Sequence, residues 1–389
     1  MSLLQPSALC VRSDWSFFNP VQLYVGRGCR AKLLDHLIRR EVLIVATQRG
    51  QKQLLEDQSM RELLTRNSVT WAGHALENPD LADLQFEIDR LKEKHFDAVI
   101  AFGGGSAIDT AKALNVALTK ECQHHTLQAL LANPSLHATV RPKPLFALPT
   151  TSGTGSEATP FATVWDRKIK KKFSLAGNSV WPYAAFVDAD LSDNLPLEPT
   201  ISTGLDTINQ AAESLWNKNA NPITLNYAIR AMQLGFLALP RLVHSNGSDR
   251  TCREQMAEAS LLAGLAISHT RTALCHSISY PITAHFGVPH GMACAFTMPA
   301  VLRLNLSGED GRFAQATRAL TGTSDLNALM ELFDHLHKTM QVSERVKQKV
   351  PSLSALLALQ GEMITPGRAD NNLVSNGCLA DILIAAWQQ

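Results

Sequence analysis

A chain of 389 residues is too long for one ordinary hydrophobic core, so the sequence predicts two domains. Its composition, with 45% apolar and 18% charged residues, is that of a soluble globular protein. A formal net charge of +1 argues against nucleic acid or an acidic membrane as the main partner, and no run of about 18 apolar residues predicts a transmembrane helix.

The N-terminus and the cysteines indicate a reducing compartment. The first residues, MSLLQPSALCVRSDWSF, lack a basic segment followed by a long apolar run, so we expect no secretory signal. The seven cysteines are scattered, odd in number and form no C-x-x-C pair, which argues against a disulfide framework or a zinc knuckle. We therefore expect reduced thiols and a cytoplasmic location.

Strands and helices alternate along the first half of the chain. Short apolar runs predict strands at residues 20–25, 42–46, 69–72, 98–102 and 145–148. The segments between them predict helices at residues 31–39, 51–66, 78–94 and 107–118. Such alternation is typical of a doubly wound parallel sheet, which we assign to an α/β domain over residues 1–192.

A glycine run, Gly103, Gly104, Gly105 and Ser106, joins the strand at 98–102 to the next helix. Glycines let the backbone approach a ligand closely, and a helix N-terminus supplies free N–H groups and a partial positive charge. A pyrophosphate group would fit there, although the run is not the G-x-G-x-x-G fingerprint. The alternative is a tight turn that needs glycine for its geometry alone.

A second loop, PTTSGTGSE at residues 149–157, follows the strand at 145–148 and is dense in hydroxyls and exposed amides. Because ligands of open α/β sheets bind at the carboxyl ends of the strands, the loop predicts a second wall along a cofactor. A flexible linker would have a similar composition. The run DRKIKKK at residues 166–172 is interpreted as the solvated tip of a hairpin, with one alternative: a lysine directed at an anionic substrate group.

From residue 193 onward the pattern becomes helical and defines a second domain, residues 193–389. Helices are predicted at residues 203–216, 222–239, 252–268, 273–284, 326–338 and 353–360. Asp, Asn and Pro cluster between residues 188 and 200, where we place the domain boundary.

Asp206 and Gln210 are four residues apart, as are His276 and Tyr280, so each pair lies on one face of its helix. His290 follows a Gly-Val-Pro turn and is expected to approach from a loop. Two oxygens and two imidazole nitrogens make a sensible shell for Fe²⁺ or Zn²⁺. The alternative for any single histidine is a core residue whose hydrogen bonds are satisfied within the protein. However, residues 273–299 hold three histidines in an almost uncharged segment, which favours a binding role.

Four segments in this order resemble the iron-containing (group III) alcohol dehydrogenases, over about residues 20 to 305. They are GGGSAIDTAK at 103–112, PTTSGTGSEAT at 149–159, the Asp206–Gln210 pair and the segment from His276 to His290. The resemblance implies a Rossmann-like N-terminal domain, an all-α C-terminal domain as in dehydroquinate synthase, and NAD(P) bound across the two loops. The implied cofactor residues are Thr47, Gly103, Gly104, Gly105, Ser106, Asp109, Thr150, Thr151, Ser152 and Thr154.

The resemblance also implies that Asp206, His276 and His290 bind a catalytic metal, Fe²⁺ or alternatively Zn²⁺. In the family the fourth ligand is normally a His, and this chain has Gln210 at that position. The family also has an additional His four residues after the first His ligand, where this chain has Tyr280. A neutral amide oxygen is a weaker ligand than imidazole. Tyr280, with an ordinary phenol pKa of about 10, is a different proton donor from His.

Within the family, SLWNKNANP at 214–222, TALCHSISYP at 272–281 and GVPHGMACAFTMP at 287–299 are most similar to the branch of phosphonate metabolism. That branch reduces phosphonoacetaldehyde to 2-hydroxyethylphosphonate. Arg271, five residues before His276, is the candidate that would bind the phosphonate dianion; the alternative is a surface arginine at a helix start.

The expected chemistry is hydride transfer between a nicotinamide and a carbonyl carbon, with the metal as Lewis acid and Tyr280 as one route for the proton. The 47–49 segment, Thr-Gln-Arg, has no acid to repel a 2′-phosphate, so NADPH is mildly favoured. We expect a homodimer. Three alternatives remain: a dehydrogenase of another small aldehyde or diol, a lyase of the dehydroquinate synthase kind, and a metal-poor binding protein.

Overall fold

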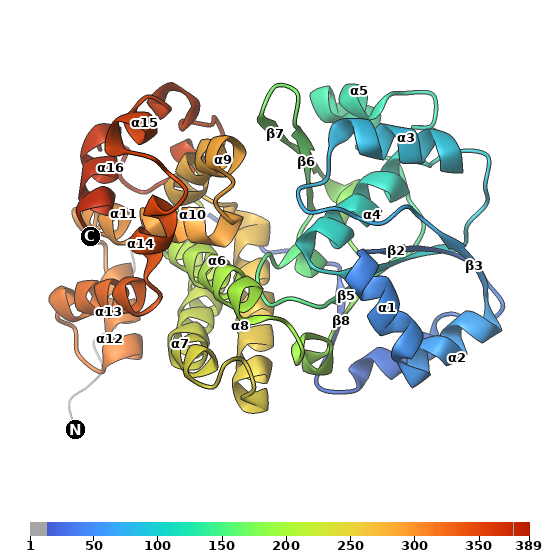
Figure 1. Cartoon of the computed structure of the whole chain (residues 1–389), viewed down its shortest axis with the longest axis horizontal. Coiled ribbons are helices and arrows are strands. Elements are labelled where there is room, and N and C mark those ends of the chain that lie inside the picture. Colours follow the sequence, from blue (N-terminus) through green and yellow to red (C-terminus); the bar gives the residue numbers. More distant parts are fainter. Residues whose placement is uncertain (1–13, 376) are drawn as a thin grey trace.

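The computed structural model describes residues 14–375 and 377–389, so Cys10 and most of the N-terminal segment inspected for a signal lie outside the described residues. Figure 1 shows a sheet-containing half and a helical half side by side. The strands of the sheet all precede residue 188, and the first long helix of the other half begins at Leu197. We propose that the boundary between the domains lies in the intervening segment.

The sheet has six strands, all parallel, in the order β1-β8-β5-β4-β2-β3. Their bounds are β1 (Gln22–Val25), β2 (Glu41–Ala46), β3 (Ser68–Trp71), β4 (Ala98–Gly103), β5 (Leu145–Pro149) and β8 (Ala184–Val187). The predicted parallel sheet and five of its strands are confirmed. Strand β8 was not predicted, because its four residues, Ala-Ala-Phe-Val, contain only one β-branched side chain.

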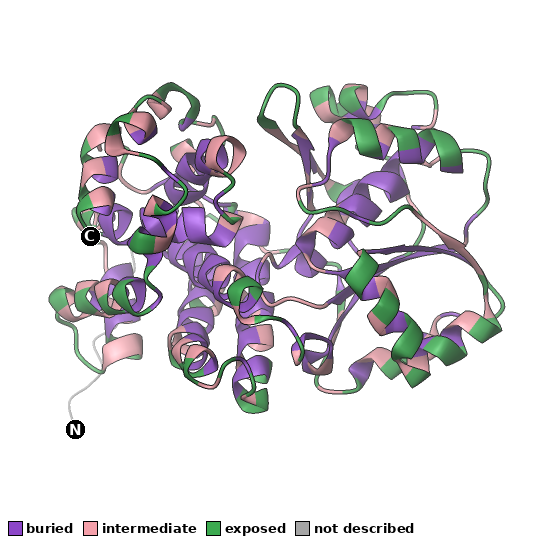
Figure 2. Ribbon diagram, in the orientation of Figure 1, coloured by how far each residue is buried: buried purple, intermediate pink, exposed green. Residues whose placement is uncertain are grey.

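Helices cover both faces of the sheet, as Figure 1 shows. One face packs against α3 (Leu81–Leu91), α4 (Gly105–Ala117) and α5 (Leu127–Ala132). The other packs against the 3₁₀ helix η1 (Cys29–Asp35), α1 (Gln48–Glu56) and α2 (Gln58–Arg66). The central strands are therefore buried on both sides (Figure 2), which explains their continuous apolar sequence.

Two of the predicted helices differ from the structure. The single helix predicted over residues 51–66 is wrong, because Asp57 adopts an extended conformation and its side chain accepts from the backbone N–H of Met60, which starts α2. The helix predicted over residues 31–39 is the shorter 3₁₀ helix η1. The predicted hairpin is confirmed as the antiparallel pair β6 (Phe161–Asp166) and β7 (Lys171–Ala176).

The helical half is built from α6 to α16. Their bounds are α6 (Leu197–Leu215), α7 (Pro222–His244), α8 (Arg250–Thr270), α9 (Leu274–Phe286), α10 (His290–Phe296), α11 (Met298–Leu306), α12 (Arg312–Thr321), α13 (Leu326–Thr339), α14 (Val342–Lys347), α15 (Leu353–Leu357) and α16 (Leu379–Gln388). The six predicted helices are present. Among the described residues, no helix has both the length and the apolar character that crossing a bilayer requires.

The strand order changes direction beside β2, since β3 lies on one side of it and β4 on the other. At such a point the loops that leave neighbouring strands diverge and open a crevice at the carboxyl ends. Thr47 follows β2, and the glycine run follows β4. Two of the predicted cofactor segments therefore start where the topology of the sheet favours a ligand, and the second loop follows the neighbouring strand β5.

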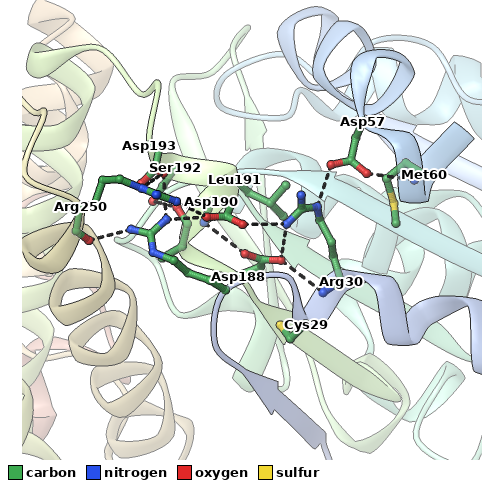
Figure 3. A network of polar contacts seen from close by, with 12 residues as sticks. Cys29, Arg30, Asp57, Met60, Asp188, Asp190, Leu191, Ser192, Asp193 and Arg250 are labelled. Carbon is green, nitrogen blue, oxygen red and sulfur yellow. Dashed lines mark hydrogen bonds and ion pairs between the residues drawn. The ribbon is translucent and has the colours of Figure 1, made fainter.

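A charge network ties the two halves together (Figure 3). Nη1 of Arg30 lies 2.7 Å from Oδ2 of Asp188, and its Nε lies 2.8 Å from Oδ2 of Asp57. Asp190 accepts from Arg250 of α8 at 2.8 Å, so helix and sheet halves share one carboxylate. The side chain of Asp188 is 0% exposed, and it depends on Arg30 for its counter-charge.

We expect Arg30→Met to lower the free energy of unfolding by about 3 kcal/mol, because it leaves the buried carboxylate of Asp188 without a counter-charge. Urea denaturation followed by circular dichroism measures the change. The matched control is Arg66→Met, which removes only an exposed ion pair with Glu62 and should cost less than about 1 kcal/mol. Equal losses in the two variants would contradict the importance of the network.

Candidate active site

A cavity of about 560 Å³ lies between the carboxyl ends of the strands and the helical half. Eight of the predicted cofactor residues line it: Thr47, Gly104, Gly105, Ser106, Asp109, Thr150, Thr151 and Thr154. The same cavity is lined by Tyr280 and by the candidate metal ligands Asp206, Gln210, His276 and His290. Residues predicted from separate segments thus face one shared space.

Gly104 and Gly105 allow the two cofactor loops to touch. A Cβ atom on Gly104 would lie 3.0 Å from Oγ1 of Thr151, and one on Gly105 would lie 2.5 Å from Cγ2 of Thr154. Gly104 also caps α4 without a side-chain acceptor, which leaves the first amides of the helix available to a ligand. An uncapped helix start beside the cavity is suited to a pyrophosphate.

Gly103 and Ser152 are not among the described residues that line this cavity. A Cβ atom on Gly103 would lie 2.6 Å from Cβ of Ala107, so the glycine permits the tight turn from β4 into α4. The carbonyl of Ser152 accepts a hydrogen bond from Oγ1 of Thr207 on α6 at 3.2 Å. Both residues shape the loops, and their direct contact with a cofactor stays a prediction.

Asp109 lines the cavity and also holds its wall together. Its Oδ1 accepts from Oγ of Ser156 at 2.5 Å, and its Oδ2 accepts from the backbone N–H of Thr163 at 2.9 Å. Burial raises the pKa of this carboxyl, although Lys112 opposes the shift. Asp109 therefore links α4 to the second loop and to the hairpin.

Three helices each direct a pair of side chains, four residues apart, to one point. The pairs are Asp206 and Gln210 on α6, His276 and Tyr280 on α9, and His290 and Cys294 on α10. One ligand atom from each of Asp206, His276, His290 and Cys294 lies within 4.8 Å of the others. The three predicted ligands that this group includes are therefore close enough to share an ion.

The expectation that His290 approaches from a loop is wrong, because His290 is the first residue of α10. This helix packs against α6 at very short distance: a Cβ atom on Gly291 would lie 1.9 Å from the carbonyl oxygen of Ser202 and 2.9 Å from Cβ of Asp206. Only glycine permits that approach. It brings His290 beside Asp206.

Glu213, one turn beyond Gln210 on α6, orients His276. Its carboxylate lies 2.7 Å from Nδ1 of His276 and accepts from the backbone N–H of Ala273 at 2.8 Å. This contact leaves Nε2 directed at Asp206, 3.3 Å from its Oδ1. Burial by itself lowers the pKa of His276, but Cys294, Glu213 and Asp206 raise it well above the ordinary value. The acidic side chains around His276 thus favour a positive charge at its imidazole.

The donor atoms fit a divalent transition metal. Within the described part of the chain, Oδ1 of Asp206 and Oε1 of Gln210 are buried and accept no hydrogen bond. Burial by itself raises the pKa of Asp206, but His276, His290 and Lys172 lower it below its ordinary value, so the carboxylate is ionised. Burial and the charge of Lys172 lower the pKa of His290 to about 3, which keeps its imidazole neutral and able to ligate.

Basic side chains gather at the Tyr280 side of the cavity. Nζ of Lys172, from the hairpin, lies 4.1 Å from the centroid of the Tyr280 ring, and Lys172 and Arg368 both line the cavity. Arg271 does not line the cavity. Its guanidinium carbon lies 5.5 Å from the ring centroid of Phe161, and Phe161 does line the cavity. A role of Arg271 at the substrate stays a prediction, while Lys172 and Arg368 already face the cavity.

Four of these residues were missed or left open by the sequence analysis. Glu213 follows Gln210 by three residues and Cys294 follows His290 by four, so each lies on the same helix face as a predicted ligand. Both could therefore have been predicted from the sequence. Lys172 was one of several lysines in a charge run. Arg368 has no local signal, because its segment follows the last predicted helix and meets the cavity only through the tertiary fold.

Two family models match the chain. The model of the iron-containing alcohol dehydrogenases matches residues 20–189, and the C-terminal model of the Fe-containing alcohol dehydrogenase family matches residues 200–354. The chain therefore belongs to the iron-containing alcohol dehydrogenase family, as its motifs predicted. Nicotinamide dinucleotide and metal binding are consistent with this assignment and with the donor cluster.

Three similar proteins illustrate the range of relatives. The chain is 38% identical to the probable alcohol dehydrogenase EutG of Salmonella typhimurium over 62% of this chain and 60% of that protein. It is 36% identical to the phosphonoacetaldehyde reductase of Streptomyces viridochromogenes over 56% of this chain and 55% of that protein. The crystal structure of sulfoacetaldehyde reductase from Bifidobacterium kashiwanohense with NAD+ is 27% identical, with a TM-score of 0.82, over 96% of this chain and 98% of that chain.

We expect Glu213→Gln to weaken metal binding by about 10- to 100-fold, because the amide cannot orient and polarise His276 as the carboxylate does. Chelator competition with Zn²⁺ or Co²⁺ measures the affinity. Glu309→Gln is the control, since Glu309 also accepts two backbone N–H bonds but lies just before α12 and is exposed. Unchanged affinity in the Glu213 variant would refute the orienting role.

Proposed function

We propose that this protein is a metal-dependent NAD(P)H oxidoreductase that reduces a small aldehyde bearing an anionic group, with phosphonoacetaldehyde as the substrate and 2-hydroxyethylphosphonate as the product. The observation that supports this most is the position of Lys172 and Arg368, which line the same cavity as the donor cluster. A short aldehyde could place its carbonyl at the cluster and its anionic end near these cations.

In this proposal Asp206, Gln210, His276 and His290 hold the metal, and Thr47, the glycine run and the threonines of the second loop hold the cofactor. The bound metal would polarise the carbonyl oxygen, and the nicotinamide would supply the hydride. The side chains around the cluster position the substrate and exclude water, since most of them are buried.

Tyr280 donates the proton that the carbonyl oxygen needs after hydride transfer. Burial by itself raises the pKa of Tyr280, but Lys172 and Arg368 lower it below the ordinary value of a phenol. A hydroxyl with a lowered pKa is a better donor at neutral pH. Its ring lies 20° from parallel to that of His290, with centroids 6.0 Å apart, so the phenol stands next to the donor cluster.

A second candidate substrate is an aldehyde without a charged end, which the 32% identity to the NAD-dependent methanol dehydrogenase of Bacillus methanolicus supports. The two basic side chains in the cavity favour the anionic substrate, and so does the similarity to reductases of phosphonoacetaldehyde and sulfoacetaldehyde. The metal-poor binding protein is disfavoured because the donor atoms converge and are well buried.

Cofactor choice is proposed to depend on the segment after β2. Thr47 and Arg49 line the cavity there, and the segment has no carboxylate that would repel a 2′-phosphate. We therefore propose NADPH as a substrate at least as good as NADH. The cytoplasmic location and the homodimer stay predictions; the free thiols of the described cysteines agree with a reducing compartment.

We expect Arg368→Gln to lower kcat/KM for phosphonoacetaldehyde about tenfold or more, because it removes a charge-assisted contact worth about 1.5–3 kcal/mol. For propionaldehyde, which has no anionic group, the change should stay within about twofold by the same reasoning. Lys168→Gln, at the exposed tip of the hairpin, is the control. Equal losses with both aldehydes, or a wild-type preference for propionaldehyde, would count against an anionic substrate.

We expect the wild-type enzyme to use NADPH at least as efficiently as NADH, and Arg49→Ala to lower kcat/KM for NADPH about tenfold while NADH changes by about twofold at most. The physical reason is the loss of a cation beside the adenosine 2′-phosphate. Initial rates of NAD(P)H oxidation measure both ratios. A several-fold advantage of NADH in the wild type would refute the cofactor preference.

A further inference from the structure

Cys294 stands one helical turn after His290 on the same face of α10. Its side chain is 0% exposed. The sulfur lies 3.8 Å from Nδ1 and 3.8 Å from Nε2 of His290. The sulfur therefore lies beside the imidazole of a candidate metal ligand, within weak hydrogen-bond distance of both ring nitrogens.

The surroundings of Cys294 separate it from the other buried cysteines of the helical half. Cys252 and Cys275 belong to the large apolar core of that half, as do the neighbours of Cys294 in sequence, Ala293 and Ala295. Cys294 is fully buried yet absent from this core. It faces polar atoms instead, which a cysteine that only fills space would not do.

The distances in the cluster suit ligands of one metal ion. Bonds of about 2.0–2.3 Å from a metal to nitrogen, oxygen and sulfur place neighbouring ligand atoms about 3.5 Å apart. The separation between Nε2 of His276 and Oδ1 of Asp206 is 3.3 Å, and that between the sulfur and the His290 nitrogens is 3.8 Å. All four ligand atoms lie within 4.8 Å of one another, so a small contraction would bring them within bonding distance of one ion, with further positions left for Gln210 and the substrate oxygen.

We propose that Cys294 binds the metal as a thiolate, together with Asp206, His276 and His290. This inference rests on the metal centre of the proposed function and adds a ligand to it. On binding, the S–H bond breaks, the sulfur lone pair bonds to the cation and the proton leaves to the solvent. A thiolate is a soft ligand, so the site selects Zn²⁺ or Co²⁺ over Mg²⁺ and Mn²⁺.

The test uses the full-length protein loaded with Co²⁺, and Cys275→Ser as the matched control. Cys275 is an equally buried thiol beside His276, but adjacent helical residues point about 100° apart, so it belongs to the core. We expect the wild type and Cys275→Ser to show a sulfur-to-cobalt charge-transfer band in the near ultraviolet, and Cys294→Ser to bind Co²⁺ without it. Chelator competition should show about tenfold or greater loss of affinity in Cys294→Ser.

X-ray absorption at the zinc edge of the wild-type protein tests the ligand without any variant. We expect one sulfur scatterer at about 2.3 Å. A shell of nitrogen and oxygen alone, with the metal bound, would overturn the role of Cys294 and leave the metal centre intact. Absence of stoichiometric binding of either metal would overturn both.

Discussion

The close contact between α6 and α10 is the constraint on which the candidate active site depends. Gly291 packs against the backbone of Ser202, and no side chain could occupy that space. The contact places a buried carboxylate beside two imidazoles and a thiol, in a region where the helices otherwise present an apolar core. Such a group of polar atoms is costly to bury unless a cation shares them. The binding of a cation and the packing of these two helices are therefore coupled.

Much of the fold follows from the periodicity of the sequence. The apolar strands and the glycine run predicted the parallel sheet and the loops at its carboxyl ends, because buried parallel strands have an unmistakable composition. Elements without that composition were missed: β8 is four residues long, and α10 begins directly at a candidate ligand. Asp57 divides one predicted helix into two through a local side-chain cap, which a periodic pattern does not reveal.

The candidate active site was predictable to the extent that its residues repeat along a helix face. Asp206, Gln210 and His276 were found by spacing, and His290 by its place after a turn in an almost uncharged segment with three histidines. Helical spacing could also have given Glu213 and Cys294. Lys172 and Arg368 are different. They come from a hairpin and from a C-terminal segment whose place at the cavity is decided by long-range packing, so no local pattern distinguishes them from other basic residues.

The hairpin has a further consequence for the timing of the reaction. Lys172 belongs to the sheet half and Tyr280 to the helical half, and they meet across the cleft. If the halves move apart to admit substrate, the ammonium leaves the phenol while water reaches it, so the charge that lowers the pKa of Tyr280 and the burial that raises it are lost together. The charge of Lys172 would then act on the phenol only when the halves are closed. Closure would also exclude water and so protect the reduced cofactor from reacting in an open cleft.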